Sequence, residues 1–239
     1  MAREVFKTKL TRLRQVTPTM KELVIDVDKA HNFAFKAGQF IMLQVPVPES
    51  QKLAQRAYSI ASSDEHINHF KLLIKHVPGG LASEYVANMK EGDALDFTGP
   101  WGKCVFKTPV PEQVLFFCTG SGLAQHISFL LSDSPQFTQT KFRMLIGVGN
   151  DEEVFYREEL EEAKRRVKDL ELHWSISRPS DQWKGKKGRI TQHIMDFDFK
   201  SISTHVYLCG RSEMIKDAKE ILVEQNGFPR ENLIIENFG

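Results

Sequence analysis

The hydrophobic positions follow one pattern in the first hundred residues and another in the rest of the chain. The first part holds short segments rich in Val, Ile, Leu and Phe, separated by turn formers such as Pro78-Gly79-Gly80. These segments predict strands over residues 5–13, 22–27, 40–46, 58–61, 70–77 and 94–98. A short helix is predicted over residues 82–89. Successive short strands with so little helix predict an antiparallel β-barrel.

Beyond residue 110, continuous apolar runs alternate with helical patterns. The runs predict strands over residues 114–118, 144–148, 170–176, 206–209 and 233–235. Helices are predicted from the end of the first run to residue 131, over 156–168 and over 214–225. Unbroken apolar strands that alternate with helices indicate a parallel sheet covered on both faces. We therefore expect two domains, a β-barrel over residues 1–108 and an α/β domain over residues 109–239.

Composition and charge exclude several classes of protein. The chain has 239 residues, of which 41% are hydrophobic and 26% charged, with a net charge of +1. That balance argues against a nucleic-acid binder dominated by phosphate contacts. No apolar run approaches the roughly 18 residues that a membrane span needs, which argues against membrane insertion. The first residues lack the apolar core of an export signal, so we expect a cytoplasmic protein.

The cysteines do not suggest a disulfide framework or a metal site. Cys104, Cys118 and Cys209 are widely spaced along the chain. They fit neither paired bridges nor the spacing of a zinc or plant-type iron–sulfur site. No bound metal is expected.

The first candidate site is Arg56-Ala57-Tyr58-Ser59, at the end of a polar loop and the start of a predicted strand. Arginine has a planar fork of donors that suits phosphate oxygens. Residues two apart in a strand point the same way, so Arg56 and Tyr58 share a face. The alternative is an edge strand with an exposed Arg and a half-buried Tyr.

The second candidate is the loop from Pro78 to Ser83, which follows the predicted strand residues Leu72 to Lys75 and precedes the short helix. Free N–H groups at a helix start, approached closely because glycine lacks a side chain, favour an anion. The alternative is an ordinary hairpin turn followed by a helix cap.

The third candidate is a pair of glycines, Gly120 and Gly122, at a predicted strand-to-helix turn. This is the context that a dinucleotide site requires. The third glycine of the usual fingerprint is missing, as is a carboxylate about twenty residues further on. Cys209-Gly210 also ends a predicted parallel strand, where ligands bind in such folds. The alternative for Cys209 is a buried structural cysteine.

In their order along nearly the whole chain, these motifs resemble the ferredoxin–NADP⁺ reductase family. The resemblance implies that Arg56 meets the FAD pyrophosphate, that Tyr58 packs on the flavin and that Ser59 approaches flavin N5. It further implies FAD contacts from the strand and loop that follow, namely Ile74, Lys75, Gly80, Leu81, Ala82 and Ser83.

The nucleotide motif of the family, T-G-x-G-x-A-P, matches Thr119 to Ala124 and includes Gly120 and Gly122, but Gln125 stands where proline is usual. Gly147 resembles a glycine in the second nucleotide strand. The resemblance places Cys209 and Gly210 beside the nicotinamide.

At the chain end, Glu236-Asn237-Phe238 resembles the E-x-aromatic ending of the family. Glu236 is then a neighbour of Ser59 and Cys209, and Phe238 covers the flavin as a gate that the nucleotide displaces. The alternative is a packed strand end. We predict that Ser59, Cys209, Glu236 and Phe238 form the catalytic set.

The choice between NADP and NAD depends on Ser177, Arg178, Lys184, Lys186, Lys187 and Arg189, of which Arg178 and Arg189 are the best candidates and Lys187 is the next. NADP carries one more phosphate, which cations and hydroxyls can hold. This set favours NADP, while NAD stays possible if the set is only a solvated basic loop.

The predicted function is that of an FAD-dependent NADPH oxidoreductase serving a ferredoxin- or flavodoxin-like carrier. An acidic carrier would need a basic docking face, for which the candidates are Arg3, Lys7, Lys9, Arg12 and Arg14. The alternative is that these five residues are ordinary charges on a strand surface. The alternative functions are a free-flavin or ferric reductase and an electron-transfer subunit of a multicomponent enzyme.

Overall fold

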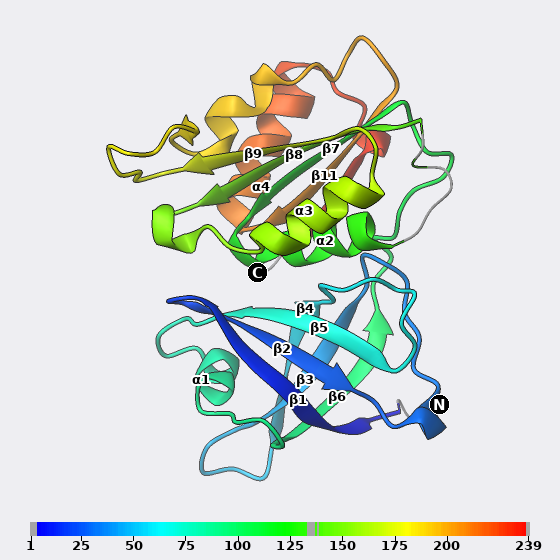
Figure 1. Ribbon diagram of the computed structural model, residues 1–239, viewed down its shortest axis with the longest axis vertical. Helices are drawn as coiled ribbons and strands as arrows, with labels where there is room; N and C mark the ends of the chain where they lie inside the picture. Colours follow the sequence, from blue (N-terminus) through cyan, green and yellow to red (C-terminus); the bar gives the residue numbers. More distant parts are fainter. Residues whose placement is uncertain (1–3, 133–136, 138, 238–239) are drawn as a thin grey trace.

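A computed structural model describes residues 4–132, 137 and 139–237 of the chain. These residues form two six-stranded sheets. In Figure 1 the N-terminal sheet lies below the C-terminal one, with helices of the C-terminal part between them.

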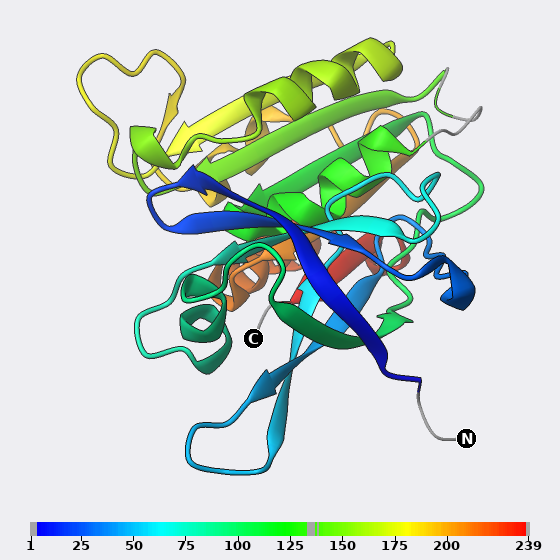
Figure 2. The same ribbon diagram turned by 60° about the horizontal axis from the view of Figure 1, so that its bottom comes forward.

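The N-terminal sheet is antiparallel, with the strand order β4-β3-β6-β1-β2-β5. Its strands are β1 (Phe6–Thr17), β2 (Met20–Asp26), β3 (Phe40–Pro46), β4 (Leu53–Ser59), β5 (His69–Lys75) and β6 (Ala94–Trp101). A backbone bridge between Ile60 and Leu72 connects the two ends of this order. The sheet therefore curls into a barrel, as predicted, and the β3–β4 hairpin projects from it (Figure 2).

Alternation along the strands fills the barrel with apolar side chains. On β1 the residues Phe6, Thr8 and Leu10 are buried and their neighbours are exposed. The rings of Phe6 and Phe97 stack with their centroids 5.0 Å apart. The short helix α1 (Leu81–Ala87) adds Ala82 and Val86 to the same core.

The C-terminal sheet is parallel, with the order β10-β9-β8-β7-β11-β12. Its strands are β7 (Gln113–Thr119), β8 (Lys141–Val148), β9 (Leu170–Ile176), β10 (Lys186–Lys187), β11 (Thr204–Gly210) and β12 (Leu233–Asn237). Every residue of β11 is buried. This explains why the central strands have continuous apolar sequences.

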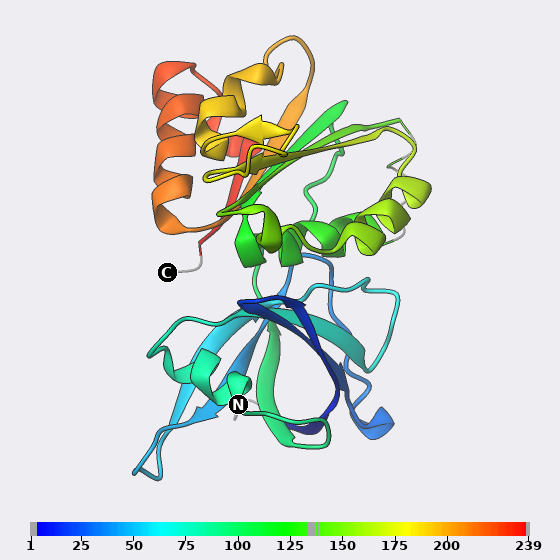
Figure 3. The same ribbon diagram turned by 60° about the vertical axis from the view of Figure 1, so that its left-hand side comes forward.

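Helices cover both faces of the parallel sheet (Figure 3). On the face toward the barrel lie α2 (Leu123–Leu131) and α3 (Arg157–Arg166), which share a core with Phe116 of β7. On the other face lie the 3₁₀ segment η5 (Ile190–Asp196), α4 (Ser212–Lys219) and its continuation η6 (Glu220–Gln225). The predicted α/β architecture is confirmed.

Among the strands, β4 and β10 differ most from the sequence prediction. Strand β4 begins at Leu53, whereas the prediction began at residue 58, because most of β4 is an exposed edge without apolar alternation. The two-lysine strand β10 was not predicted, since only its pairing with Ser175 and Ile176 defines it. The predicted domain boundary at residues 108 and 109 falls between β6 and β7, and its position there stays a prediction.

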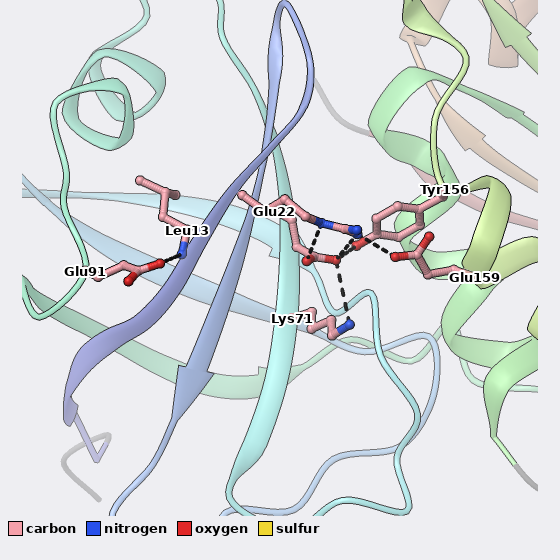
Figure 4. Close-up of polar contacts among 7 residues, drawn as sticks. Leu13, Glu22, Lys71, Glu91, Tyr156 and Glu159 are labelled. Atoms are coloured by element: carbon pink, nitrogen blue, oxygen red, sulfur yellow. Dashed lines mark hydrogen bonds and ion pairs between the residues drawn. The ribbon is translucent and has the colours of Figure 1, made fainter.

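A polar network fastens the barrel to α3 (Figure 4). Glu22 of β2 is 3% exposed, and its carboxylate accepts hydrogen bonds from Arg14 at 3.1 Å and from the hydroxyl of Tyr156 at 2.5 Å. Arg14 also reaches Glu159 at 2.5 Å, and Lys71 lies 3.8 Å from Glu22. Burial and the charge of Glu22 hold the pKa of Tyr156 well above its usual 10, so Tyr156 is the donor.

No helix in the described ranges is both long enough and apolar enough to cross a membrane.

Candidate active site between the barrel and the parallel sheet

Three of the four predicted catalytic residues, Ser59, Cys209 and Glu236, meet where the parallel strands end against the barrel. Cys209 of β11 pairs with Cys118 of β7 on one side and with Glu236 of β12 on the other. Across the junction, the hydroxyl of Ser59 at the end of β4 donates a hydrogen bond to Oε1 of Glu236. The sequence prediction named Ser59, Cys209 and Glu236 together, and the structure brings them together.

The carboxyl group of Glu236 is half-buried and held on both sides. Gln125 Nε2 donates to the second oxygen, Oε2, at 2.6 Å. Burial raises the pKa of Glu236 to about 7, although the hydrogen bonds from Ser59 and Gln125 oppose this rise. Glu236 can therefore take up or release a proton near neutral pH.

The cysteines around this carboxyl group are thiols. Burial, followed by the charge of Glu236, holds the pKa of Cys209 well above its ordinary value of 9. The same two causes raise the pKa of Cys104 to about 12. A thiolate nucleophile at Cys209 is thus disfavoured.

The glycine-rich turn after β7 packs directly against the end of β11. A side chain on Gly122 would overlap the carbonyl oxygen of Cys209, and one on Gly210 would overlap Thr119 Oγ1. Gly120, with φ +53°, faces open space. The turn therefore leaves room beside Gly120 for a ligand, as a nucleotide phosphate would need.

Gly147 of β8 has a packing role in this structure. A Cβ atom at this position would overlap the side chain of Ile190 and lie 3.2 Å from Thr119 Cγ2. Glycine at this point lets η5 lie close to the end of the sheet.

On the barrel side, Arg56 is exposed and Tyr58 half-buried on the same strand. Arg56 Nη1 donates to the adjacent carbonyl of Gln55 at 2.9 Å. Burial raises the pKa of Tyr58 to about 12, while the charge of Arg56 opposes the rise. A cation beside a neutral aromatic ring fits the pyrophosphate and ring system of FAD.

In the predicted FAD loop, from Pro78 to Ser83, the side chain of Ser83 forms hydrogen bonds that hold the loop in its conformation. The Ser83 hydroxyl donates to the carbonyl of Val77 at 2.8 Å and accepts from the Val77 N–H at 3.0 Å. Gly80 precedes α1 as its N-cap, and Leu81 is half-buried in the first turn. The side chains of Ala82 and Ile74 lie in the barrel core, so these two residues can offer only backbone groups to a ligand.

Lys75, for which the sequence predicts an FAD contact, forms an ion pair with Glu153, which follows β8 of the parallel sheet. Its Nζ lies 2.9 Å from Glu153, and the other carboxylate oxygen of Glu153 accepts from the Gly149 N–H at 2.8 Å. Although burial opposes it, these hydrogen bonds lower the pKa of Glu153. A small cavity that includes Gly120 in its lining adjoins this pair.

The predicted phosphate-binding set lies at the carboxyl ends of β9 and β10. The backbone N–H groups of Ser177 and Arg178 donate to the carbonyls of Val148 and Gly149, at 3.0 and 2.9 Å. Ser177, Arg178, Lys187 and Arg189 are all exposed. Within residues 4–132, 137 and 139–237, no ion pair involves Arg178, Lys187 or Arg189, whereas Lys186 lies 2.5 Å from Asp196.

Phe238, the predicted gate, lies outside the described residues. In the described part of the chain, no three or more His, Cys, Asp or Glu side chains form a group that could hold a metal ion.

Sequence reasoning missed two residues of this region. Gln125 was noted only as a departure from a proline pattern, and that departure was the signal available. Glu153 lies in an acidic run, Asp151-Glu152-Glu153, which is typical of solvent-exposed charges at the start of a helix. Only the fold brings its carboxylate to Lys75.

Comparisons with known proteins follow the same division of the chain. Residues 7–106 match the model of an oxidoreductase FAD-binding domain, and residues 116–220 match that of an oxidoreductase NAD-binding domain. The chain is 28% identical to ferredoxin–NADP reductase B of Sorangium cellulosum over 242 residues, which cover 98% of both proteins.

A second relative is longer than this chain. The anthranilate 1,2-dioxygenase electron transfer component of Acinetobacter baylyi is 28% identical over 220 residues, which cover 91% of this chain and 63% of that protein. The fold is similar to that of a ferredoxin NADP⁺ reductase from Neisseria gonorrhoeae solved with bound FAD and NADP. The TM-score is 0.83 at 22% identity, over 98% of this chain and 99% of that one.

Proposed function

The chain belongs to the ferredoxin–NADP⁺ reductase family of FAD- and NAD(P)-binding oxidoreductases, and from this we propose that it takes hydride from NADPH onto FAD and passes electrons to a small carrier protein. The observation that carries the proposal is the contact between Ser59 of the barrel and Glu236, beside Cys209 of the parallel sheet. One polar cluster thereby joins the flavin-binding part to the nucleotide-binding part.

FAD, when bound, supplies hydride acceptance and stepwise release of electrons. The protein supplies position and exclusion of water. In our proposal Arg56 holds the pyrophosphate and Tyr58 packs against the flavin ring. The first turn of α1 offers the backbone N–H groups of Leu81, Ala82 and Ser83 to the diphosphate, whereas the Gly80 N–H donates to the carbonyl of Val77 at 2.9 Å.

At the junction, Ser59 and Glu236 share a hydrogen bond and Cys209 fills the space beside them. Glu236, with its pKa near 7, can take up or release a proton at this junction while Ser59 Oγ holds one of its oxygens. Gly120 leaves room for the nucleotide at the end of β7, while Thr119 and Gly122 pack against the end of β11.

The preference for NADPH over NADH is supported by the unpaired cations at the ends of β9 and β10. Arg178, Lys187 and Arg189 are exposed, and in the described ranges none has a carboxylate partner to displace. A dianionic phosphate gains charge-assisted hydrogen bonds from such groups.

For the acceptor, we propose a ferredoxin- or flavodoxin-like carrier, because the chain aligns with nearly all of a ferredoxin–NADP reductase. The alternative of an electron-transfer subunit is favoured by the Acinetobacter relative, which is itself an electron transfer component. A reductase of free flavin or ferric chelates is the remaining alternative. The three differ in the acceptor that is reduced fastest.

The first test is the visible spectrum of the purified protein, followed by anaerobic addition of NADPH or NADH. We expect a yellow protein that NADPH bleaches much faster than NADH does. Equal bleaching would retain the reductase and remove the NADPH preference. A protein that fails to bind FAD yet oxidises NADPH with free flavin would favour the flavin reductase, and no oxidation under any condition would refute the proposal.

A further inference from the structure

We propose that Gln125 is a positioning residue for Glu236: its amide holds one carboxylate oxygen while Ser59 holds the other, and this hydrogen bond sets the pH at which Glu236 changes its protonation. The inference rests on the proposed function for its catalytic consequence. The effect of Gln125 on the protonation of Glu236 concerns only side chains of this protein and does not depend on the proposed function.

The geometry defines the role of the amide. Gln125 is fully buried on α2, and its Nε2 lies 2.6 Å from Glu236 Oε2 and 3.4 Å from the carbonyl oxygen of Gly38. Both neighbours are acceptors, so the amide must present its NH₂ group to them. The amide also forms a hydrogen bond with the thiol of Cys104, which opposes the rise in the pKa of that thiol.

The position of Gln125 explains why this residue can replace proline. It lies in the first turn of α2, where proline is tolerated because the first backbone N–H groups have no partner within the helix. Proline offers no donor at this point. Glutamine keeps the turn and adds a side chain long enough to reach β12, so the departure from the family pattern introduces a second hydrogen bond to the carboxyl group.

Three other side chains lie close enough to Glu236 to affect its pKa. Ser59 approaches it from β4, Cys209 from β11 and Cys104 from the connection after β6. The three are neutral near pH 7, because hydroxyls do not titrate there and burial keeps both thiols protonated. Ser59 and Gln125 are thus the donors that oppose the effect of burial on Glu236.

Removal of the donor should therefore move the titration of Glu236 upward. In Gln125→Met, a side chain of similar length without a donor, we expect Glu236 to lose its proton about one pH unit higher, because a donor to a carboxylate stabilises the charged form. The midpoint is measured by NMR of ¹³C-labelled glutamate carboxyl groups in the full-length, FAD-loaded protein. Glu236→Gln identifies the signal by removing it.

Ser128→Ala is the matched control. Ser128 lies on the same helix, is buried, and donates to the carbonyl of Ser62 in the barrel at 2.7 Å, without contacting Glu236. We expect this variant to leave the midpoint of Glu236 unchanged. If Ser128→Ala shifts the midpoint as much as Gln125→Met does, the effect comes from general packing of α2 and the proposal is wrong.

Gln125→Glu provides a second test should the methionine variant fold poorly. It places a second carboxyl group against Glu236, so the pair should share a proton and titrate at a still higher pH. An unchanged Glu236 midpoint in either folded variant would overturn the proposal.

The same variants separate this inference from the proposed function. If the protein reduces no acceptor with NADPH, the function fails, yet the NMR midpoints still test Gln125. If the function holds, we expect the pH profile of kcat in Gln125→Met to shift in the same direction as the midpoint. A lower kcat with an unshifted profile would mean that Gln125 is only structural.

Discussion

At the scale of the residue, Glu236 links function to stability. Its pKa in the folded protein, about 7, lies above the ordinary value of 4.5 because burial disfavours the charged form. Folding therefore favours the protonated carboxyl group. The resulting stabilisation of the folded protein is fully present below about pH 4.5 and is lost as the pH rises through about 7.

The variant Glu236→Gln should remove this pH dependence. We expect its free energy of unfolding relative to the wild type to increase between about pH 5 and pH 8 by about 1–2 kcal/mol, a value reduced for partial solvent screening. Ser59 can accept from the new amide, so the local contacts persist. Urea denaturation at the two pH values measures the difference, and an equal difference at both would contradict the prediction.

A second residue-scale prediction concerns the nucleotide. Replacing Arg178 by alanine removes an exposed guanidinium at the end of β9 and should lower the preference for NADPH over NADH about tenfold in kcat/KM. The rate with NADH should hardly change. Lys168→Ala, which removes an exposed cation just before β9, at the end of the strand opposite to Arg178, is the control. An equal loss with both nucleotides would mean that Arg178 supports the loop rather than the phosphate.

Single residues also show how far the sequence could predict the site. Ser59, Cys209 and Glu236 were predicted together because each lies in a motif that resembles the family. Gln125 and Glu153 were not, because Gln125 departs from its motif, Glu153 lies in none, and their roles depend on the atoms that they meet. Lys75 carries a motif, yet its length lets it reach the other sheet.

At the scale of the element, the attachment of β1 and β2 to α3 depends on a buried carboxylate. In Arg14→Met, Glu22 loses its bidentate partner while it stays almost fully buried. The buried charge would then face only Lys71, at 3.8 Å, and the Tyr156 hydroxyl, so we expect a loss of about 2 kcal/mol in the free energy of unfolding. Chemical denaturation measures it.

Arg12→Met is the matched control for that variant, since Arg12 is exposed on the same strand, and its effect should stay within about 0.5 kcal/mol. The double variant Arg14→Met, Glu22→Leu should recover part of the loss because it removes the charge as well. If the double variant loses as much free energy of unfolding as the single variants Arg14→Met and Glu22→Leu lose together, this explanation is wrong.

Elements also differ in how well a linear pattern predicts them. Strands β7 and β11 are buried along almost their whole length, so their sequences are continuously apolar and were recognised. Strand β4 is an exposed edge, and β10 is a pair of lysines, so neither has a hydrophobic signature. Their pairing partners define them.

At the scale of the whole molecule, the charge on the barrel bears on the proposed carrier. Lys7, Lys9 and Arg12 are exposed along β1, whereas Arg14 is engaged with Glu22 and Glu159, and Arg3 lies outside the described residues. Of the predicted docking residues that the structure describes, Arg14 is therefore engaged within the protein, and Lys7, Lys9 and Arg12 remain exposed.

Charge reversal tests this face. The double variant Lys7→Glu, Lys9→Glu should slow reduction of an acidic ferredoxin about tenfold at low ionic strength, with a smaller effect as salt increases. Reduction of a small dye should be unaffected. Lys219→Glu on α4, on the far face of the parallel sheet, is the control. If both variants slow the carrier equally, β1 is not the docking face.

The sequence by itself determined the two halves of this protein, because alternation and continuous apolar runs follow directly from whether a sheet is buried on one face or on both. It also determined the chemistry of each half, since Arg56, Tyr58 and the glycines carry local motifs. The tertiary structure alone decided how the halves meet. Ser59 and Glu236 lie 177 positions apart, and their contact depends on the packing of α2, α3 and the barrel rather than on any local pattern.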